Sequence, residues 1–355
     1  MNLSDVYSAK RIAIVHKEVA SNKIPYLGKA LFPFQKKAGL DLSWIKTSKG
    51  LPVSLKPSAF DTVSTIRSRE GISIEETEMA YFKESMLVKE KDEQEILRVQ
   101  ESSDPYAKDV INHIFDDAET LIAGAEVVPE RMVWQLLAPQ TNGKPQISLS
   151  ADGATYAYDY DPTGAWKTSN YTALSGTSVW SDTTHSDPIA DLDTMAENIE
   201  TLTGERPTLL VISAQTMRYL KQNDKVKNYI LAQNQTATVV VTDARVKELI
   251  KNELKMDTVV YTKQFKDETG TAQKFYPDGF ASLLPNRALG NTWFGTTPEE
   301  RSKQKNAEFD CELVEEGIAV AVTQTHDPEH TKTTASEICL PSYESMDYVG
   351  VIKVY

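Results

Sequence analysis

Five residues near the C-terminal end have the types and spacing of a metal-dependent hydrolase. His326-Asp327-Pro328-Glu329-His330 matches the H-x-x-E-H pattern of one class of zinc peptidases. That chemistry needs both histidines on one face of a helix, so that they can share a metal ion. Pro328 would disrupt such a helix, and polar residues flank the motif on both sides. We therefore expect a solvated loop here and no metal.

Other residue types that can do chemistry lack the sequence neighbours that the chemistry requires. Cys311 and Cys339 are the only cysteines, and their spacing gives neither a disulfide framework nor a structural zinc pattern. His16, His113 and His185 stand isolated, and no G-x-S-x-G sequence marks a nucleophile. We predict no catalytic residue, no cofactor-binding residue, no metal ligand and no enzymatic activity.

The strand expected at 208–212 invites a nucleotide-binding interpretation, because alternating strands and helices often hold cofactors at strand ends. A phosphate site needs a glycine-rich turn after such a strand, but the chain continues Ser213-Ala214-Gln215-Thr216. No Walker sequence and no G-x-G-x-x-G occurs anywhere in the chain. This excludes the common nucleotide-binding classes, so the elements themselves must indicate the function.

The N-terminal part of the chain has the pattern of arms. Residues 1–40 are expected to be a short helical or irregular arm, anchored by the apolar segment 27–33. Residues 44–88 alternate with the period of a β-strand around a charged tip at 65–71. An isolated long hairpin is marginal in water and exposes unpaired backbone. The pattern therefore favours an arm that lies against another subunit.

Helical periodicity follows the arm. Residues 89–99 are a charged helical stretch, and Asp104 and Pro105 can start the next helix. Apolar residues spaced three and four apart then predict a long amphipathic helix, with Pro129 as a point where it kinks or restarts. Its apolar positions are Val110, Ile111, Ile114, Phe115, Ala118, Leu121, Ile122 and Ala125, resuming with Met132, Val133, Leu136 and Leu137.

The remainder predicts strands and then a mixed α/β unit. Residues 144–160 alternate as strands, whereas 161–187 are rich in Ser, Thr, Gly and Asp and indicate an exposed connection. A helix should begin at Asp187-Pro188 and end at Gly204. Strands and helices then alternate over strand 208–213, helix to about 232, strand 238–241, helix 244–254 and strand 258–262, with later strands at 317–325 and 348–354.

Composition and charge bound the class of protein. The chain has 355 residues, of which 40% are hydrophobic and 25% charged, which suits about two folding units. The net charge of −13 argues against a general nucleic-acid binder. Residues 1–50 hold nine basic and three acidic residues, a net of +6, so the rest carries −19. No run approaches the roughly 18 apolar residues of a membrane span, and we expect a cytosolic protein without membrane partners.

Four segments, in this order and spacing, resemble the major capsid proteins of tailed bacteriophages, in particular the family of the phage lambda head protein, major capsid protein E. The resemblance covers nearly the full length. The segments are Leu27-Gly28-Lys29-Ala30-Leu31-Phe32-Pro33, Ile66-Arg67-Ser68-Arg69, Ser186-Asp187-Pro188, and Phe275-Tyr276-Pro277-Asp278-Gly279 followed by Leu289-Gly290-Asn291-Thr292.

The resemblance implies an α+β chain with the Hong Kong 97-like viral capsid fold. Its parts would be an N-terminal arm at 1–43 and an extended β-hairpin loop at 44–88. A peripheral domain with a long spine helix would span 89–186 and take up the C-terminal strands at 326–355. A mixed α/β axial domain would span 187–325.

The resemblance also implies a function in self-assembly. Hexamers and pentamers would close into an icosahedral head shell around packaged DNA, with a scaffolding protein, a portal and a decoration protein as partners, assembled in the host cytoplasm. We expect inter-subunit contacts at Trp44, Arg67, Arg69 and Glu70, and an interior-facing basic surface at Lys36 and Lys37. A tail-tube or head-completion subunit, or an enzyme with an α/β core, remains as an alternative.

Overall fold

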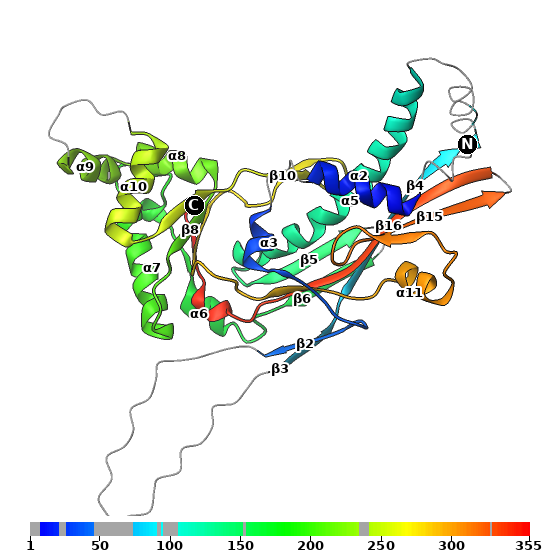
Figure 1. Cartoon of the computed structure of the whole chain (residues 1–355). Coiled ribbons are helices and arrows are strands. Elements are labelled where there is room, and N and C mark those ends of the chain that lie inside the picture. The colour runs from blue at the N-terminus through cyan, green and yellow to red at the C-terminus, as the bar shows by residue number, and fades with distance from the viewer. Residues whose placement is uncertain are drawn as a thin grey trace, which may run out of the picture. The chain divides into compact units, whose positions relative to one another are not determined.

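The computed structural model describes residues 8–20, 26–45, 74–90, 94, 106–151, 154–233, 241–326 and 329–355. None of the helices in these ranges is both long and apolar enough to cross a lipid bilayer. The charged tip at 65–71 and most of the stretches 89–99 and 238–241 lie outside the described residues. Figure 1 labels the elements that the following paragraphs use.

The chain divides into two compact units, and each collects segments that are distant in the sequence. Unit 1 consists of residues 1–43, 76–132 and 290–342, and unit 2 of residues 44–75, 133–289 and 343–355. These boundaries differ from the four predicted segments, since 290–325 belongs with unit 1 and 133–186 with unit 2. The reason is strand pairing, which joins late strands to early ones in both units.

Unit 1 is built around a six-stranded sheet with the strand order β1-β13-β16-β15-β14, in which β4 also pairs with β16. Its elements are α2 (Ala9–Ala20), α3 (Leu27–Leu31), β1 (Phe34–Lys36), β4 (Ala80–Lys89), the first part of α5 (Tyr106–Leu137), β13 (Asn291–Phe294), α11 (Pro298–Lys305), β14 (Cys311–Leu313), β15 (Ala319–His326) and β16 (Glu329–Ser342).

Strand β4 is the largest departure from the predicted arm. The hairpin was expected to extend to residue 88, but β4 pairs antiparallel with β16 from Ala80 opposite Cys339 to Lys89 opposite His330. The alternation that predicts a strand is present, yet its partner comes from the far end of the chain. The strand β4 belongs to the sheet and not to the arm because it pairs with β16, which lies about 250 residues further along the sequence. The alternation within β4 does not indicate which strand it pairs with.

Helix α5 is the predicted spine helix. It runs without interruption from Tyr106 to Leu137, and Pro129 lies inside it, so the helix neither ends nor restarts at the proline. Ala118 and Ile122 are buried in one cluster with Ile12 of α2 and with Val314 and Val320 of the β14–β15 region. At these two positions the helix is thus covered by the N-terminal helix and the sheet of unit 1.

Unit 2 contains a five-stranded sheet with the order β7-β17-β12-β8-β9 and two separate hairpins. Its elements are β5 (Gln146–Ala151), β6 (Ala154–Asp159), α6 (Ala165–Asn170), β7 (Tyr171–Ala173), η1 (Gly176–Ser178), α7 (Pro188–Thr203), β8 (Leu209–Ile212), α8 (Ala214–Gln222), α9 (Asp224–Gln233), α10 (Asp243–Leu254), β9 (Asp257–Val260), β10 (Gln264–Lys266), β11 (Ala272–Lys274), β12 (Phe280–Leu284), η2 (Met346–Tyr348) and β17 (Gly350–Lys353).

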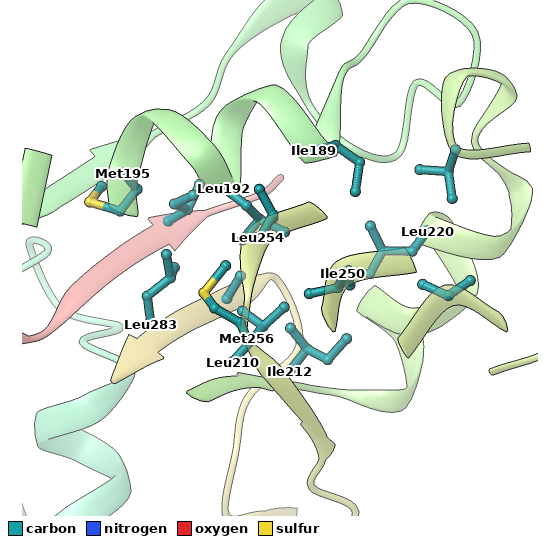
Figure 2. Packing of buried hydrophobic residues seen from close by; sticks show 14 of the residues in the cluster. Ile189, Leu192, Met195, Leu210, Ile212, Leu220, Ile250, Leu254, Met256 and Leu283 are labelled. Carbon is teal, nitrogen blue, oxygen red and sulfur yellow. The ribbon is translucent and has the colours of Figure 1, made fainter. Parts of the chain in front are cut away.

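The core of unit 2 lies between its sheet and its helices. Leu210 of β8 and Leu283 of β12 meet Leu192 of α7, Leu220 of α8 and Ile250 of α10, and all five side chains are buried (Figure 2). Four residues of β8 in succession are fully or almost fully buried. A continuous apolar strand of this kind is typical of a sheet covered on both faces.

Helix α7 begins and ends where the sequence predicts. Asp187 is the N-cap, and its side chain accepts a hydrogen bond from the backbone N–H of Ala190 at 3.2 Å. Gly204 closes the helix with a φ of 77°, a left-handed conformation that glycine adopts at little cost. Leu202, in the last turn of the helix, is 45% exposed.

The segment 161–187 is not the exposed connection that its composition indicates. It contains α6, β7 and η1, and the side chains of Trp166, Asn170 and Trp180 are buried. The Nε1–H of Trp166 donates to the carbonyl of Met346 at 2.9 Å, and the Asn170 amide donates to the carbonyls of Asp347 and Val349. The prediction was wrong because these partners lie at the other end of the chain.

Candidate functional site

Two short strands form the base of the predicted arm. β2 (Asp41–Ile45) and β3 (Ile74–Glu78) pair with each other in a sheet of their own, and the chain between them holds most of the predicted arm (Figure 1). The N–H of Met79 donates to the carbonyl of Leu40 at 2.9 Å, just beyond the ends of both strands. Residues 46–73, which connect the two strands in sequence, lie outside the described residues.

Trp44, a predicted contact residue, lies on the β2 side of this base. Its ring stacks on Tyr160 with centroids 5.6 Å apart, and Tyr160 in turn meets Tyr343 edge to face at 6.4 Å. Tyr343 is buried. Burial raises the pKa of its hydroxyl well above the ordinary value, and the negative charge of Asp347 raises it further. Trp44 thus anchors the base of the arm within its own subunit.

The predicted basic and charged contact residues fall into two groups. Arg67, Arg69 and Glu70 lie outside the described residues. Lys36 forms an ion pair with Glu300 at 2.8 Å, and the backbone N–H of Lys37 donates to the carbonyl of Phe294. Part of the basic charge near the N-terminus is therefore compensated by carboxylates of the same subunit.

The apolar anchor at 27–33 is shaped by one close approach. The N–H of Gly28 donates to Glu130 Oε1 at 3.2 Å, and a Cβ atom at Gly28 would lie 2.2 Å from Glu130 Oε2. Phe32 is fully buried, and strand β1 follows it and pairs parallel with β13. This motif, part of the resemblance described above, fixes the entry of the chain into the sheet.

The motif at 275–279 is also structural. The hydroxyl of Tyr276 donates to the carbonyl of Val211 at 2.9 Å and lies 2.9 Å from Ser282 Oγ, so it joins β8 to β12. Gly279 has a φ of 86°, and its carbonyl accepts from the N–H of Val354. Where the motifs lie within described residues, they hold strands and helix ends in place.

His326, Glu329 and His330 of the hydrolase-like motif lie on strands and not on a helix. His326 pairs with Glu329 where β15 and β16 meet as antiparallel strands, so the two histidines do not share a helical face. Cys311 and Cys339 are both free and buried, on β14 and β16 respectively. Burial raises the pKa of the Cys311 thiol to about 11, which keeps it protonated and unreactive near neutral pH.

His16 was expected to be isolated, and this expectation is wrong. Its ring is 1% exposed, with Nδ1 at 3.1 Å from Glu119 Oε1 and Nε2 at 3.4 Å from Glu126 Oε1. Glu315 lies close enough to complete a three-residue cluster of possible metal ligands with His16 and Glu126. Because these residues come from three distant segments, only the tertiary structure reveals the cluster.

Comparison with known proteins decides what kind of molecule this is. The sequence model of phage major capsid protein E matches residues 17–311 of the chain. The chain belongs to the phage major capsid protein E family. The match covers the predicted arm at 44–88, helix α5 and almost all of unit 2. No curated protein matches the chain.

Solved structures share the fold at low sequence identity. A protein assigned as the capsid protein of a prophage of E. coli CFT073 has a TM-score of 0.61 at 12% identity, over 98% of this chain and 99% of that one. A phage-related protein from Bordetella bronchiseptica RB50 gives 0.57 at 15% identity, over 98% and 96%. The capsid of cyanophage A-1(L) gives 0.52 at 15% identity, over 93% and 92%.

These findings confirm the resemblance that the four motifs indicated. The protein is a phage major capsid protein with the Hong Kong 97-like viral capsid fold, in which helices and sheets are mixed in both units. Its family is one of structural proteins of the virion head. The family match favours a major capsid protein over the alternatives of a tail-tube or a head-completion subunit.

Proposed function

We propose that the chain assembles as hexamers and pentamers of an icosahedral shell around packaged DNA, without catalysing a reaction. The family and the fold support a shell protein. The observation that carries the finer proposal is the two-stranded base made by β2 and β3, which pair with each other in a sheet of their own. In this proposal the residues between the two strands serve as the extended loop.

The physics of a two-stranded ribbon supports contact with a neighbour. Two paired strands leave one row of N–H and C=O groups on each outer edge, and such a ribbon alone is barely stable in water. A neighbouring subunit supplies both the missing hydrogen bonds and apolar contact. Each subunit in a closed shell contacts several neighbours, so modest interfaces add up to a stable particle.

We assign unit 1, with the spine helix and the six-stranded sheet, to the peripheral domain. Unit 2, with its five-stranded sheet and four larger helices, corresponds to the axial domain at the centre of each capsomer. The shell assembles in the host cytoplasm and forms the virion head. Scaffolding protein, portal, a decoration protein and DNA are the partners that such a shell requires.

The arm proposal predicts that a shortened arm abolishes shells and leaves the subunit folded. In the variant, residues 48–71 are replaced by an Asn-Gly turn, which suits a tight hairpin between β2 and β3. We expect soluble subunits with the same far-UV circular dichroism and melting temperature, and no closed particles by electron microscopy.

A second variant separates charge at the tip from arm length. Arg67→Glu with Arg69→Glu should also prevent shells, because the contact on the neighbour would become repulsive. Arg67→Lys with Arg69→Lys is the matched control and should still assemble, since both charges remain. Normal particles from the shortened arm would overturn the proposal, as would equal yields from the two double variants.

A further inference from the structure

A buried histidine in unit 1 is surrounded by carboxylates from two other parts of the chain. His16 lies on α2, Glu126 on α5, and Glu315 in the turn between β14 and β15. One ligand atom from each lies within 4.8 Å of the other two. The imidazole is 1% exposed, and the two carboxylates are 18% and 24% exposed, so the site lies at the edge of the core.

Glu119 fixes the orientation of the ring. Its two oxygens lie 3.1 and 3.3 Å from His16 Nδ1. A carboxylate only accepts hydrogen bonds, so Nδ1 carries a proton in this contact. Metal-binding histidines almost always donate their second N–H to a carboxylate or a carbonyl, which sets the tautomer and leaves the other nitrogen to bind the ion. Glu119 occupies that supporting position.

The second nitrogen of the ring faces a second carboxylate. With its proton on Nδ1, neutral His16 presents a lone pair at Nε2, and Glu126 Oε1 lies 3.4 Å away. Two electron pairs at this separation repel unless a proton or a metal ion lies between them. A third carboxylate, Glu315, has an oxygen within 4.8 Å of the ligand atoms of His16 and Glu126.

One carboxylate of the cluster has a lysine partner on one of its two oxygens. Lys29 pairs with Glu315 Oε2 at 2.5 Å, which leaves the second oxygen of that carboxylate to contact an ion.

We propose that His16, Glu126 and Glu315 bind a divalent first-row transition-metal ion of the zinc type, with Glu119 as the positioning residue. One imidazole nitrogen with two carboxylate oxygens suits Zn²⁺ or Mn²⁺ better than Mg²⁺ or Ca²⁺, which prefer oxygen ligands alone. A water molecule would complete four-coordination. The two half-buried carboxylates approach the ion by small side-chain rotations.

The ion would join the N-terminal helix to the spine helix and the β14–β15 turn. Below the site, Ile12, Ala13 and Ile122 pack in the apolar cluster that already connects α2 with α5. An ion that binds only the folded arrangement stabilises it by mass action. The bound metal would therefore hold α2 on unit 1 independently of shell assembly.

Calorimetry on the unassembled full chain tests the proposal. After dialysis against a chelator, Zn²⁺ alone is titrated, and we expect one ion per chain and a melting temperature that rises with Zn²⁺. Glu119→Gln should weaken binding by about 10- to 100-fold, the usual loss when a supporting partner of a ligand is removed. His16→Gln and Glu126→Gln should weaken it further.

His185→Gln is the matched control, because His185 forms an exposed pair with Asp182 at 2.9 Å. This variant should bind Zn²⁺ as the unaltered chain does. X-ray absorption should show only nitrogen and oxygen ligands at about 2.0 to 2.2 Å. If His16→Gln fails to fold, Glu315→Gln at the rim of the site gives the same test without disturbing α2.

Two results would overturn the proposal. One is the absence of stoichiometric Zn²⁺ binding, which would mean that a proton holds His16 and Glu126 together. The other is unchanged affinity in Glu126→Gln and Glu315→Gln, which would place any bound zinc elsewhere in the chain.

Discussion

At the scale of single residues, Glu299 is a buried carboxylate that accepts hydrogen bonds from two other side chains. It lies in the first turn of α11, is 6% exposed, and accepts hydrogen bonds from Lys83 Nζ at 2.5 Å and Ser336 Oγ at 2.7 Å. Burial alone would raise its pKa, but the hydrogen bonds from Lys83 and Ser336 outweigh burial and lower it. Glu299 thus joins α11 to β4 and β16.

The lowered pKa of Glu299 predicts a pH-dependent contribution to stability. A carboxyl with a depressed folded-state pKa stabilises the protein above its ordinary value of 4.5, and the contribution is lost as pH falls through the lower folded-state value. We expect Glu299→Gln to cost about 1 to 2 kcal/mol at pH 7 and progressively less as the pH falls below 4.5. Urea unfolding of subunits across this range measures the difference.

The control for this experiment is Glu308→Gln, because Glu308 is exposed and undergoes the same chemical change. Its stability should run parallel to that of the unaltered chain at every pH. A constant deficit for Glu299→Gln down to pH 3 would show that the loss comes from packing and not from the ionised carboxylate.

At the scale of elements, signals within a few residues of each other predicted well, and long-range partners did not. The cap at Asp187, the proline after it and the glycine at 204 defined α7 at both ends. The α5 periodicity predicted the spine helix, although Pro129 did not interrupt it. In contrast, Trp166 and Trp180 lie in a Ser- and Thr-rich segment whose composition indicates exposure to solvent. The indole N–H of Trp166 donates to the carbonyl of Met346, and the backbone N–H of Trp180 donates to the carbonyl of Val354.

The cap of α7 gives a prediction for a single element. Asp187→Ala removes the acceptor for the Ala190 N–H, and loss of an N-cap costs about 1 kcal/mol. Asp187→Ser keeps a capping oxygen and removes only the exposed pair with Lys225 at 3.1 Å, so it should cost only about a few tenths of a kcal/mol. Chemical denaturation of subunits distinguishes the two, and equal losses would assign the effect to the ion pair.

At the scale of the whole molecule, charge is unevenly distributed along the chain. Residues 1–50 carry +6 within a total of −13, yet Lys29 and Lys36 pair with Glu315 and Glu300 of the same subunit. The sequence showed the asymmetry, but the intramolecular pairing depends on strands β1 and β13 being neighbours. In the same way, the metal-ligand cluster at His16 depends on three segments that meet only in the fold.

This distribution predicts which lysine governs assembly on a polyanion. If the N-terminal segment faces a shell interior with DNA or scaffold, Lys37→Gln should lower particle yield, and the loss should diminish as salt screens the charge. Lys36→Gln should instead destabilise the subunit slightly, because Glu300 loses its partner. Lys305→Gln, an exposed lysine of unit 1, is the control, and yields independent of both salt and Lys37 would contradict the interior assignment.

The connection between the arm and the central sheet has a mechanical consequence. Met79 alone separates β3 from β4, and β4 is bonded to β16 along its ten residues. Tension applied to β3 along the strand direction therefore reaches a ladder loaded in shear, in which the bonds must break together and not one after another. A pull on the arm would therefore strain the β4–β16 ladder before the strand could peel away.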